Sequence, residues 1–266
     1  MAMVEVERAQ VAYRVDGNGP GLVLVHGTGA DSQSNWAHLV EQFTSDWTVV
    51  RPDYSGSGET QDHGGALTIE MLAEQVIAAA NAATVAPFDL VGYSLGAAIV
   101  AYIAAEHPEQ VRSVVLLAGA AKGSDSRLQL QFELWRDLIR TDRRALARVV
   151  LLTGFSPDFV TGWSRKQVDE TIEMILTTNR WEGMARQVEL DLKLDVSEQV
   201  KRIAKPTLVI GCTHDHMVPP SHARELASAI PGARYVEMQA GHLAPLECPD
   251  EFVQLVKDFL QAPSAS

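Results

Sequence analysis

The chain has 266 residues, a formal net charge of −12 and 46% hydrophobic residues, which suits one large domain with a buried core. The acidic balance disfavours phosphate backbones and anionic lipid surfaces, so we expect neither a nucleic-acid partner nor a membrane partner. No apolar run approaches the length of a membrane span, and the first residues lack the basic start and apolar block of a signal peptide. Together with two cysteines that show no paired-motif spacing, these features predict a cytoplasmic protein.

In chain order, short apolar or alternating segments predict strands, and helical spacing follows most of them. The predicted strands are residues 4–9, 11–17, 22–25, 47–53, 88–94, 112–119, 207–212 and 234–239. The predicted helices outside the middle of the chain are residues 35–43, 67–83, 95–107, 221–230 and 249–260. The first two strands predict an antiparallel pair. The alternation that follows predicts right-handed crossovers and a mostly parallel sheet.

Residues 121–203 interrupt this alternation. They show helical spacing without a strand, with Leu128, Phe132, Trp135 and Ile139 recurring at i, i+4, i+7 and i+11. We therefore expect an α/β core made of residues 1–120 and 204–266, with a helical insertion at residues 121–203. Ligands of such sheets bind beyond the carboxyl ends of the strands, so the corners there are the places to look for a site.

One such corner is the segment DLVGYSLGAA, in which Gly92 and Gly96 flank Ser94. A serine between a strand and a helix can be an N-cap that accepts backbone N–H groups. It can also be a nucleophile at a sharp turn, because G-x-S-x-G between a strand and a helix is typical of that arrangement. A serine nucleophile needs a base, and the base needs an acid that orients it. His242 and Asp215 follow the last two predicted strands and are the candidates, in the chain order serine, aspartate, histidine.

With these residues in place, the chain resembles the α/β-hydrolase superfamily over nearly its whole length. The segments that carry the resemblance are His26-Gly27, Asp53 with Gly56 to Gly58, Gly92 to Gly96, Asp215 with Val218-Pro219, and Gly241-His242. The resemblance implies a mostly parallel eight-stranded sheet with helices on both faces, and it makes the insertion a helical cap, or lid, domain.

The resemblance also implies the roles of the site residues. Ser94 is the expected nucleophile, His242 the base and Asp215 the orienting acid. The backbone N–H groups of Thr28 and Leu95 are the expected oxyanion hole, because preformed donors must stabilise the charge of a tetrahedral intermediate.

Other polar residues have simpler interpretations. His214 and His216 flank Asp215 and suggest a metal site, but no third ligand occurs at a metal-like spacing, so we expect neither a metal nor a cofactor. The resemblance implies structural roles for Asp53 and His26, with Asp53 bracing the loop after its strand and His26 lying under the oxyanion loop.

A serine nucleophile attacks a carbonyl carbon, which leaves esters, thioesters, lactones, amides and the C–C bonds of diketones as targets. We expect a serine esterase that cleaves a small apolar or aromatic ester, thioester or lactone through an acyl-enzyme on Ser94. The residues expected to line its substrate pocket are Tyr93, Trp135, Phe159, Trp163 and Met217.

Several alternatives stay open. A C–C bond hydrolase, an acyltransferase and a cofactor-free haloperoxidase or perhydrolase would use the same three residues. A signalling receptor with the hydrolase fold would keep the triad and act by binding. The partners expected are a small-molecule substrate and, as an open alternative, a second copy of the chain in a homodimer.

Overall fold

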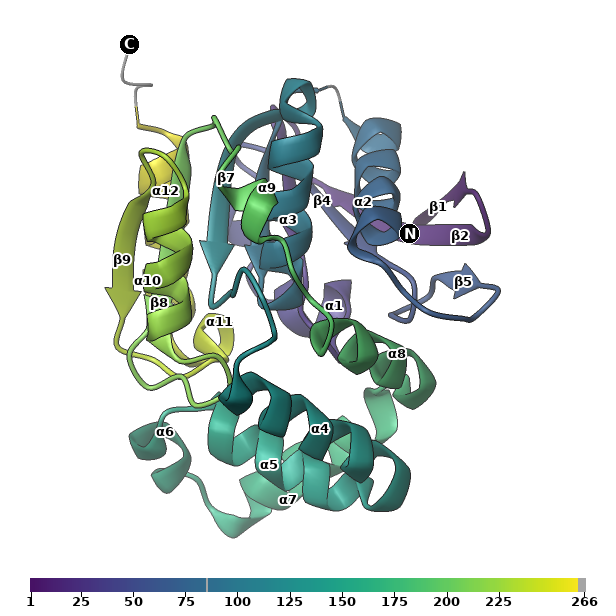
Figure 1. Cartoon of the computed structure of the whole chain (residues 1–266), viewed down its shortest axis with the longest axis vertical. Helices are drawn as coiled ribbons and strands as arrows, with labels where there is room; N and C mark the ends of the chain where they lie inside the picture. The colour runs from purple at the N-terminus through teal and green to yellow at the C-terminus, as the bar shows by residue number, and fades with distance from the viewer. Residues whose placement is uncertain (85, 263–266) are drawn as a thin grey trace.

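A computed structural model describes residues 1–84 and 86–262 and contains one twisted sheet (Figure 1). The sheet follows the order β1-β2-β4-β3-β6-β7-β8-β9, and the short β5 pairs with β2. β1 and β2 run antiparallel to their neighbours, and all other pairs on this path are parallel. The strands are β1 (Ala2–Val6), β2 (Ala9–Asp16), β3 (Gly21–Val25), β4 (Thr48–Asp53), β5 (Gln61–Asp62), β6 (Phe88–Tyr93), β7 (Val111–Leu117), β8 (Thr207–Cys212) and β9 (Arg234–Met238).

Helices cover both faces of this sheet, as the sequence predicts. The helices of the sheet region are α1 (Ser32–Trp36), α2 (Ile69–Ala83), α3 (Leu95–Glu106), α9 (Ser197–Val200), α10 (Pro220–Ala229), α11 (Ala244–Glu247) and α12 (Pro249–Leu260), with 3-10 turns η1 (Val40–Gln42) and η2 (Pro108–Gln110). The predicted mostly parallel α/β sheet is thereby confirmed, with β5 added. Among the helices of the described residues, none is long and apolar enough to cross a lipid bilayer.

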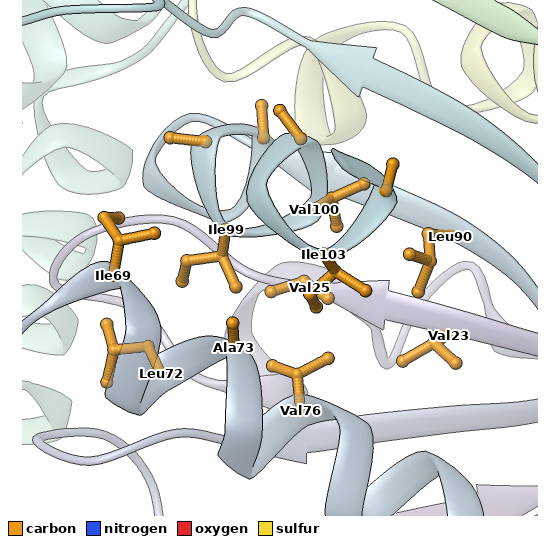
Figure 2. Close-up of a cluster of buried hydrophobic side chains, with 14 of the residues drawn as sticks. Val23, Val25, Ile69, Leu72, Ala73, Val76, Leu90, Ile99, Val100 and Ile103 are labelled. Atoms are coloured by element: carbon orange, nitrogen blue, oxygen red, sulfur yellow. The ribbon is translucent and has the colours of Figure 1, made fainter. Parts of the chain in front are cut away.

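The central strands are buried on both faces, because successive side chains of a strand point to opposite sides of the sheet. In β6, Leu90 belongs to the core cluster beneath α2 and α3, whereas Val91 belongs to the cluster beneath α1 and α12. Figure 2 shows the first cluster, where side chains of α2 and α3 meet those of β3 and β6. Burying a side chain of this size stabilises the fold by roughly 1.5–3 kcal/mol, so the strands are held firmly beneath the site.

The segment predicted as a helix over residues 35–43 differs from the expectation. α1 begins earlier, after Asp31, whose side chain accepts hydrogen bonds from the backbone N–H groups of Gln33 and Ser34. This capping box fixes the start of the helix, and a separate 3-10 turn follows at Val40–Gln42.

Five helices separate β7 from α9 and lie together beyond the carboxyl ends of the strands (Figure 1). We call them the cap segment: α4 (Ser126–Thr141), α5 (Arg143–Gly154), α6 (Pro157–Thr161), α7 (Arg165–Thr178) and α8 (Trp181–Asp191). The residues that follow them within the predicted insertion, including Val196, Val200 and Ile203, pack in the core cluster that contains α3.

Candidate active site

Ser94 lies at the sharp turn between β6 and α3. Its backbone has φ 55° and ψ −119°, a left-handed conformation that is strained for a residue with a side chain. The turn holds this conformation because the Ser94 N–H donates to Leu117 O at 2.9 Å, on the neighbouring strand. Such strain is typical of a nucleophile at a strand-to-helix turn. The Ser94 side chain makes no cap hydrogen bond, which argues against a simple N-cap.

The two glycines around Ser94 allow backbone segments to approach each other closely. A Cβ at Gly92 would lie 2.3 Å from Gly96 O, and a Cβ at Gly96 would lie 2.3 Å from Val25 O. Both contacts are with backbone, so no side-chain rotation could relieve them. The glycines therefore let α3 start directly against β6 and β3.

Ser94, His242 and Asp215 form a continuous hydrogen-bonded chain. His242 Nε2 lies 3.1 Å from Ser94 Oγ, and His242 Nδ1 lies 2.6 Å from Asp215 Oδ2. The other carboxylate oxygen of Asp215 accepts from the N–H groups of Met217 at 2.8 Å and Val218 at 2.7 Å. These two bonds hold the carboxylate so that Oδ2 faces the imidazole. The structure therefore brings together the three residues that the sequence selects, in the geometry of a nucleophile, a base and an orienting acid.

Residues 27–29, which we call loop 27–29, run beside the nucleophile. The Gly27 N–H donates to Asn35 Oδ1 at 3.0 Å, and the Gly29 N–H donates to Gln187 Oε1 at 2.8 Å. The Thr28 and Leu95 N–H groups, in contrast, donate to no other residue in the part of the chain that the structure describes. The Gly27 and Gly29 N–H groups are therefore fixed, and the Thr28 and Leu95 N–H groups stay available. An oxyanion hole requires this arrangement.

Helix α8 holds loop 27–29 from the cap segment. Besides accepting from Gly29, Gln187 donates to Ser57 Oγ at 3.0 Å, and Asp191 Oδ2 accepts from Thr28 Oγ1 at 2.7 Å. The backbones also meet, since a Cβ at Gly183 would lie 1.9 Å from Gly56 O. α8 is therefore part of the support of the site.

The sequence prediction does not include Asn35, Gln187 or Asp191. The last two lie 158 and 163 residues from the groups they bind, and no local pattern marks them.

Asp191 is a buried carboxyl of this region whose pKa is displaced from its ordinary value. Burial raises its pKa to about 8, against the opposing effect of the hydrogen bond from Thr28. The carboxyl is therefore mainly protonated at neutral pH, which keeps a negative charge away from Thr28. Burial also lowers the pKa of His26, which keeps that ring neutral where it stacks on Tyr54 at 4.0 Å.

The polar residues interpreted as structural have structural contacts. Asp53 accepts from the Ser32 N–H at 2.7 Å and from the Glu59 N–H at 3.3 Å, bracing the loops after β3 and β4. His26 lies against Tyr54, whose hydroxyl donates to His26 O at 2.9 Å. Within residues 1–84 and 86–262, no group of three His, Cys, Asp or Glu side chains could hold a metal ion.

A cavity of about 180 Å³ opens over Ser94 between the sheet and the cap segment. Its walls include Tyr93, Trp135 and Met217, three of the residues predicted to line the pocket. Of the Lys, Arg, Asp and Glu side chains, only Asp31 and Arg180 contribute to the described lining, and Arg180 is bound to backbone carbonyls, including Gly58 O at 2.8 Å. The cavity therefore suits a compact, neutral and largely apolar ligand.

Two predicted pocket residues, Phe159 and Trp163, do not line this cavity. Phe159 stacks on Phe155 with ring centroids 5.1 Å apart, and Trp163 packs against both rings. They join α5, α6 and α7 through a separate apolar cluster, so the structure does not bring this pair to the cavity with the other predicted pocket residues. Helical spacing predicts that an apolar residue is buried. It does not predict which neighbour covers that residue.

The fold and the site define a hydrolase of the α/β type, and the family comparison agrees. A family model described as alpha/beta hydrolase fold matches residues 20–249, so the chain belongs to this family.

The chain is also similar to individual proteins of known name or structure. It is 58% identical to a pyrrolizixenacetamide deacetylase of Xenorhabdus hominickii over 98% of both chains. Among solved structures, it is similar to the enol-lactonase from Burkholderia xenovorans LB400, with 31% identity, a TM-score of 0.87 and coverage of 98% of this chain and 100% of the other. An alpha/beta hydrolase enzyme from a Medee basin deep-sea metagenome library shares the fold at 23% identity and a TM-score of 0.92, with coverage of 100% and 99%. The chain is therefore an enzyme, a hydrolase, which sets aside the receptor alternative.

Proposed function

We propose that this enzyme removes a small acyl group, with acetyl as the reference case, from the nitrogen of a neutral and largely apolar amide. The observation that carries the proposal is the chain Ser94–His242–Asp215 opening onto a cavity in which the charged lining groups are few. The deacetylase relative at 58% identity supports an amide among the carbonyl substrates that a serine nucleophile can attack. The sequence alone favours an ester, a thioester or a lactone as the substrate. Because of the deacetylase relative, we propose an amide instead.

In the acylation half of the reaction, His242 Nε2 takes the proton of Ser94 Oγ as the oxygen attacks the carbonyl carbon. The oxyanion accepts hydrogen bonds from the Thr28 and Leu95 N–H groups, and Asp215 stabilises the imidazolium through Nδ1. The C–N bond then breaks, and the imidazolium gives its proton to the departing nitrogen. The free amine leaves, and the acyl group stays on Ser94.

In the deacylation half, a water gives a proton to His242 and attacks the acyl carbon. The second tetrahedral intermediate uses the same two N–H groups, and collapse returns the proton to Ser94 Oγ. The product is a carboxylic acid. The histidine thus acts as a base and then as an acid in both halves, which its contact with Ser94 at 3.1 Å allows.

A second candidate is hydrolysis of a lactone, which the similarity to an enol-lactonase at 31% identity favours. The chemistry differs only in that the leaving oxygen stays attached to the acyl group.

The test compares acetyl, butanoyl and octanoyl amides of one aromatic amine with the corresponding esters and with an enol-lactone. We expect acetyl amides to be cleaved with many turnovers, and an acid-quenched reaction to show an acetylated Ser94 peptide by mass spectrometry. Cleavage of the lactone together with inert amides would support the second candidate. Turnover without acylated Ser94, in enzyme sampled during the steady state and in a rapid-quench burst, would overturn the proposed mechanism.

A further inference from the structure

Three residues of the cavity lining each carry a buried polar atom that has no hydrogen-bond partner among the residues that the structure describes. The atoms are Gln131 Nε2, Trp135 Nε1 and Asn179 Oδ1. All three belong to the cap segment or its loops. A buried polar group without a partner costs roughly 1–3 kcal/mol, so a ligand that supplied partners would gain from them.

Two of these atoms are donors on the same face of α4. Gln131 and Trp135 are four residues apart, which places both side chains on one side of the helix. Trp135 is only 5% exposed, and its indole nitrogen can donate but not accept a hydrogen bond. The ring is fixed by Phe132, whose centroid lies 6.0 Å away in an edge-on contact.

The third atom is an acceptor whose orientation is set by its own amide. Asn179 Nδ2 donates to Ile175 O at 2.8 Å, so the carbonyl oxygen is the atom of this side chain that remains available. The polar side-chain atoms of the triad, in contrast, are engaged with one another, and the N–H groups that flank Thr28 in loop 27–29 bind Asn35 and Gln187. The Thr28 and Leu95 N–H groups are left for the oxyanion.

We propose that the Trp135 and Gln131 N–H groups form a subsite for a neutral carbonyl oxygen on the amine portion of the substrate, separate from the bond that is cleaved. The inference rests on the proposed function, because it assigns the cap side of the cavity to the leaving amine. Two N–H donors suit an acceptor oxygen and exclude a cation. In the described lining, Arg180 Nη1 donates to the carbonyls of Ser57, Gly58 and Thr60, which holds this guanidinium against the loop after β4. Asn179 Oδ1 adds an acceptor for an N–H group of the same substrate.

The test uses two acetanilides that differ in one atom group. The first carries a para CH2–CO–CH3 substituent, and in the second C=CH2 replaces the C=O. The methylene spacer keeps the leaving ability of the two amines alike, so a difference in kcat/KM reports the remote contact. We expect the wild-type enzyme to prefer the carbonyl probe by roughly tenfold, the value for one or two hydrogen bonds to buried donors.

Variants then locate the contact. Trp135→Phe keeps an aromatic ring without the N–H, and Gln131→Met keeps the length of the side chain without the amide. Each should lower the preference for the carbonyl probe, which is the ratio of the two kcat/KM values, about threefold or more. The matched control is Trp163→Phe, since this tryptophan lies in the cap segment but outside the cavity lining. It should keep the wild-type preference.

Binding separates this inference from the proposed function. The affinity of both probes is measured by calorimetry with Ser94→Ala, which cannot acylate, and with Ser94→Ala combined with Trp135→Phe. A preference in binding that disappears with Trp135→Phe supports the subsite even if the wild-type enzyme turns over neither amide, a result that would overturn the proposed function alone. Equal affinities for the two probes, no binding of either, or a preference that both α4 variants retain would overturn the subsite.

Discussion

The catalytic triad and the cap side of the cavity lining differ in how their polar side-chain atoms are paired. On the sheet side, each oxygen of Asp215 and both nitrogens of His242 have partners at hydrogen-bond distance. On the cap side, three residues of the lining each carry a buried polar atom that has none among the described residues. A group with fixed partners is held in position for chemistry, whereas a group without partners is available to a ligand. The comparison assigns bond cleavage to the sheet and substrate selection to α4 and α7.

α8 departs from this division. It belongs to the cap segment by sequence, yet Gln187 and Asp191 bind loop 27–29, and Arg186 forms a two-oxygen ion pair with Asp62 at 2.9 and 3.1 Å. Position in the chain is therefore a poor guide to which residues support the catalytic centre.

The largest effect is expected from Ser94→Ala, which removes the reacting oxygen from the sheet side. kcat should fall by about 10⁴-fold or more, with the circular dichroism spectrum unchanged because the turn is held by backbone contacts. The control is Ser45→Ala, at an exposed position whose hydroxyl donates to Asp46 Oδ2. Near wild-type turnover by Ser94→Ala would show that the reaction does not depend on the Ser94 hydroxyl.

Gly96→Ala should disturb the sheet side through packing. Its new Cβ would meet Val25 O and His26 O at 2.3 and 2.5 Å, so the free energy of unfolding should fall by about 3 kcal/mol and kcat should fall with it. Gly232→Ala is the matched control, because nothing lies within 4 Å and only its φ of +72° opposes a side chain. We expect the control to cost about 1 kcal/mol in urea unfolding, with normal turnover. Equal losses for the two variants would contradict the close-approach explanation.

Gln187→Met tests whether α8 acts with the sheet. The Gly29 N–H loses its acceptor, so loop 27–29 should hold the Thr28 N–H less well against the oxyanion. Because this contact matters in the transition state, kcat should fall about tenfold with KM nearly unchanged. Glu182→Gln, an exposed change on the same helix, should have no effect. A rise in KM at constant kcat would instead place Gln187 with the groups that select the substrate.

Asp191→Asn should have the smallest effect at neutral pH and a clear one at alkaline pH. As pH rises through about 8, wild-type Asp191 ionises beside Thr28, so kcat/KM should decline where the variant stays constant. Because the pKa in the folded state lies above the unfolded value near 4, the unfolded state binds fewer protons between these values. The free energy of unfolding of the wild type should therefore fall with rising pH by up to about 1.4 kcal/mol per unit over this range, and less steeply in the variant.

Denaturant unfolding and kcat/KM at pH 5, 6.5, 8 and 9 provide the measurements. Parallel profiles for the two proteins would show that Asp191 titrates elsewhere or not at all.

The sequence predicts the parts of this molecule that local patterns encode. Apolar runs and glycines reveal the strands and the turn at Ser94, and the positions of Asp215 and His242 after parallel strands bring them to the same edge of the sheet. Local sequence patterns do not predict which side chains contact one another within the cap segment. Trp135 and Trp163 are equally apolar in sequence, but one lines the cavity and the other packs on Phe155 and Phe159, a choice made by how α4 to α7 fold together. Local patterns also do not predict the role of Gln187 and Asp191, because these residues bind loop 27–29 only when α8 packs against it.

The attachment of α8 also limits how this enzyme can be recombined with its relatives. A crossover that replaced residues 121–203 as one block would import foreign partners for the backbone around Thr28. In the middle of this block, Gly154 O at the end of α5 accepts from the Leu243 N–H at 2.7 Å, so a foreign α5 end would meet the loop that carries His242. Exchange of α4 and α7 alone, with residues 154–156 and 180–191 retained, would transplant a new substrate preference onto an intact reaction centre.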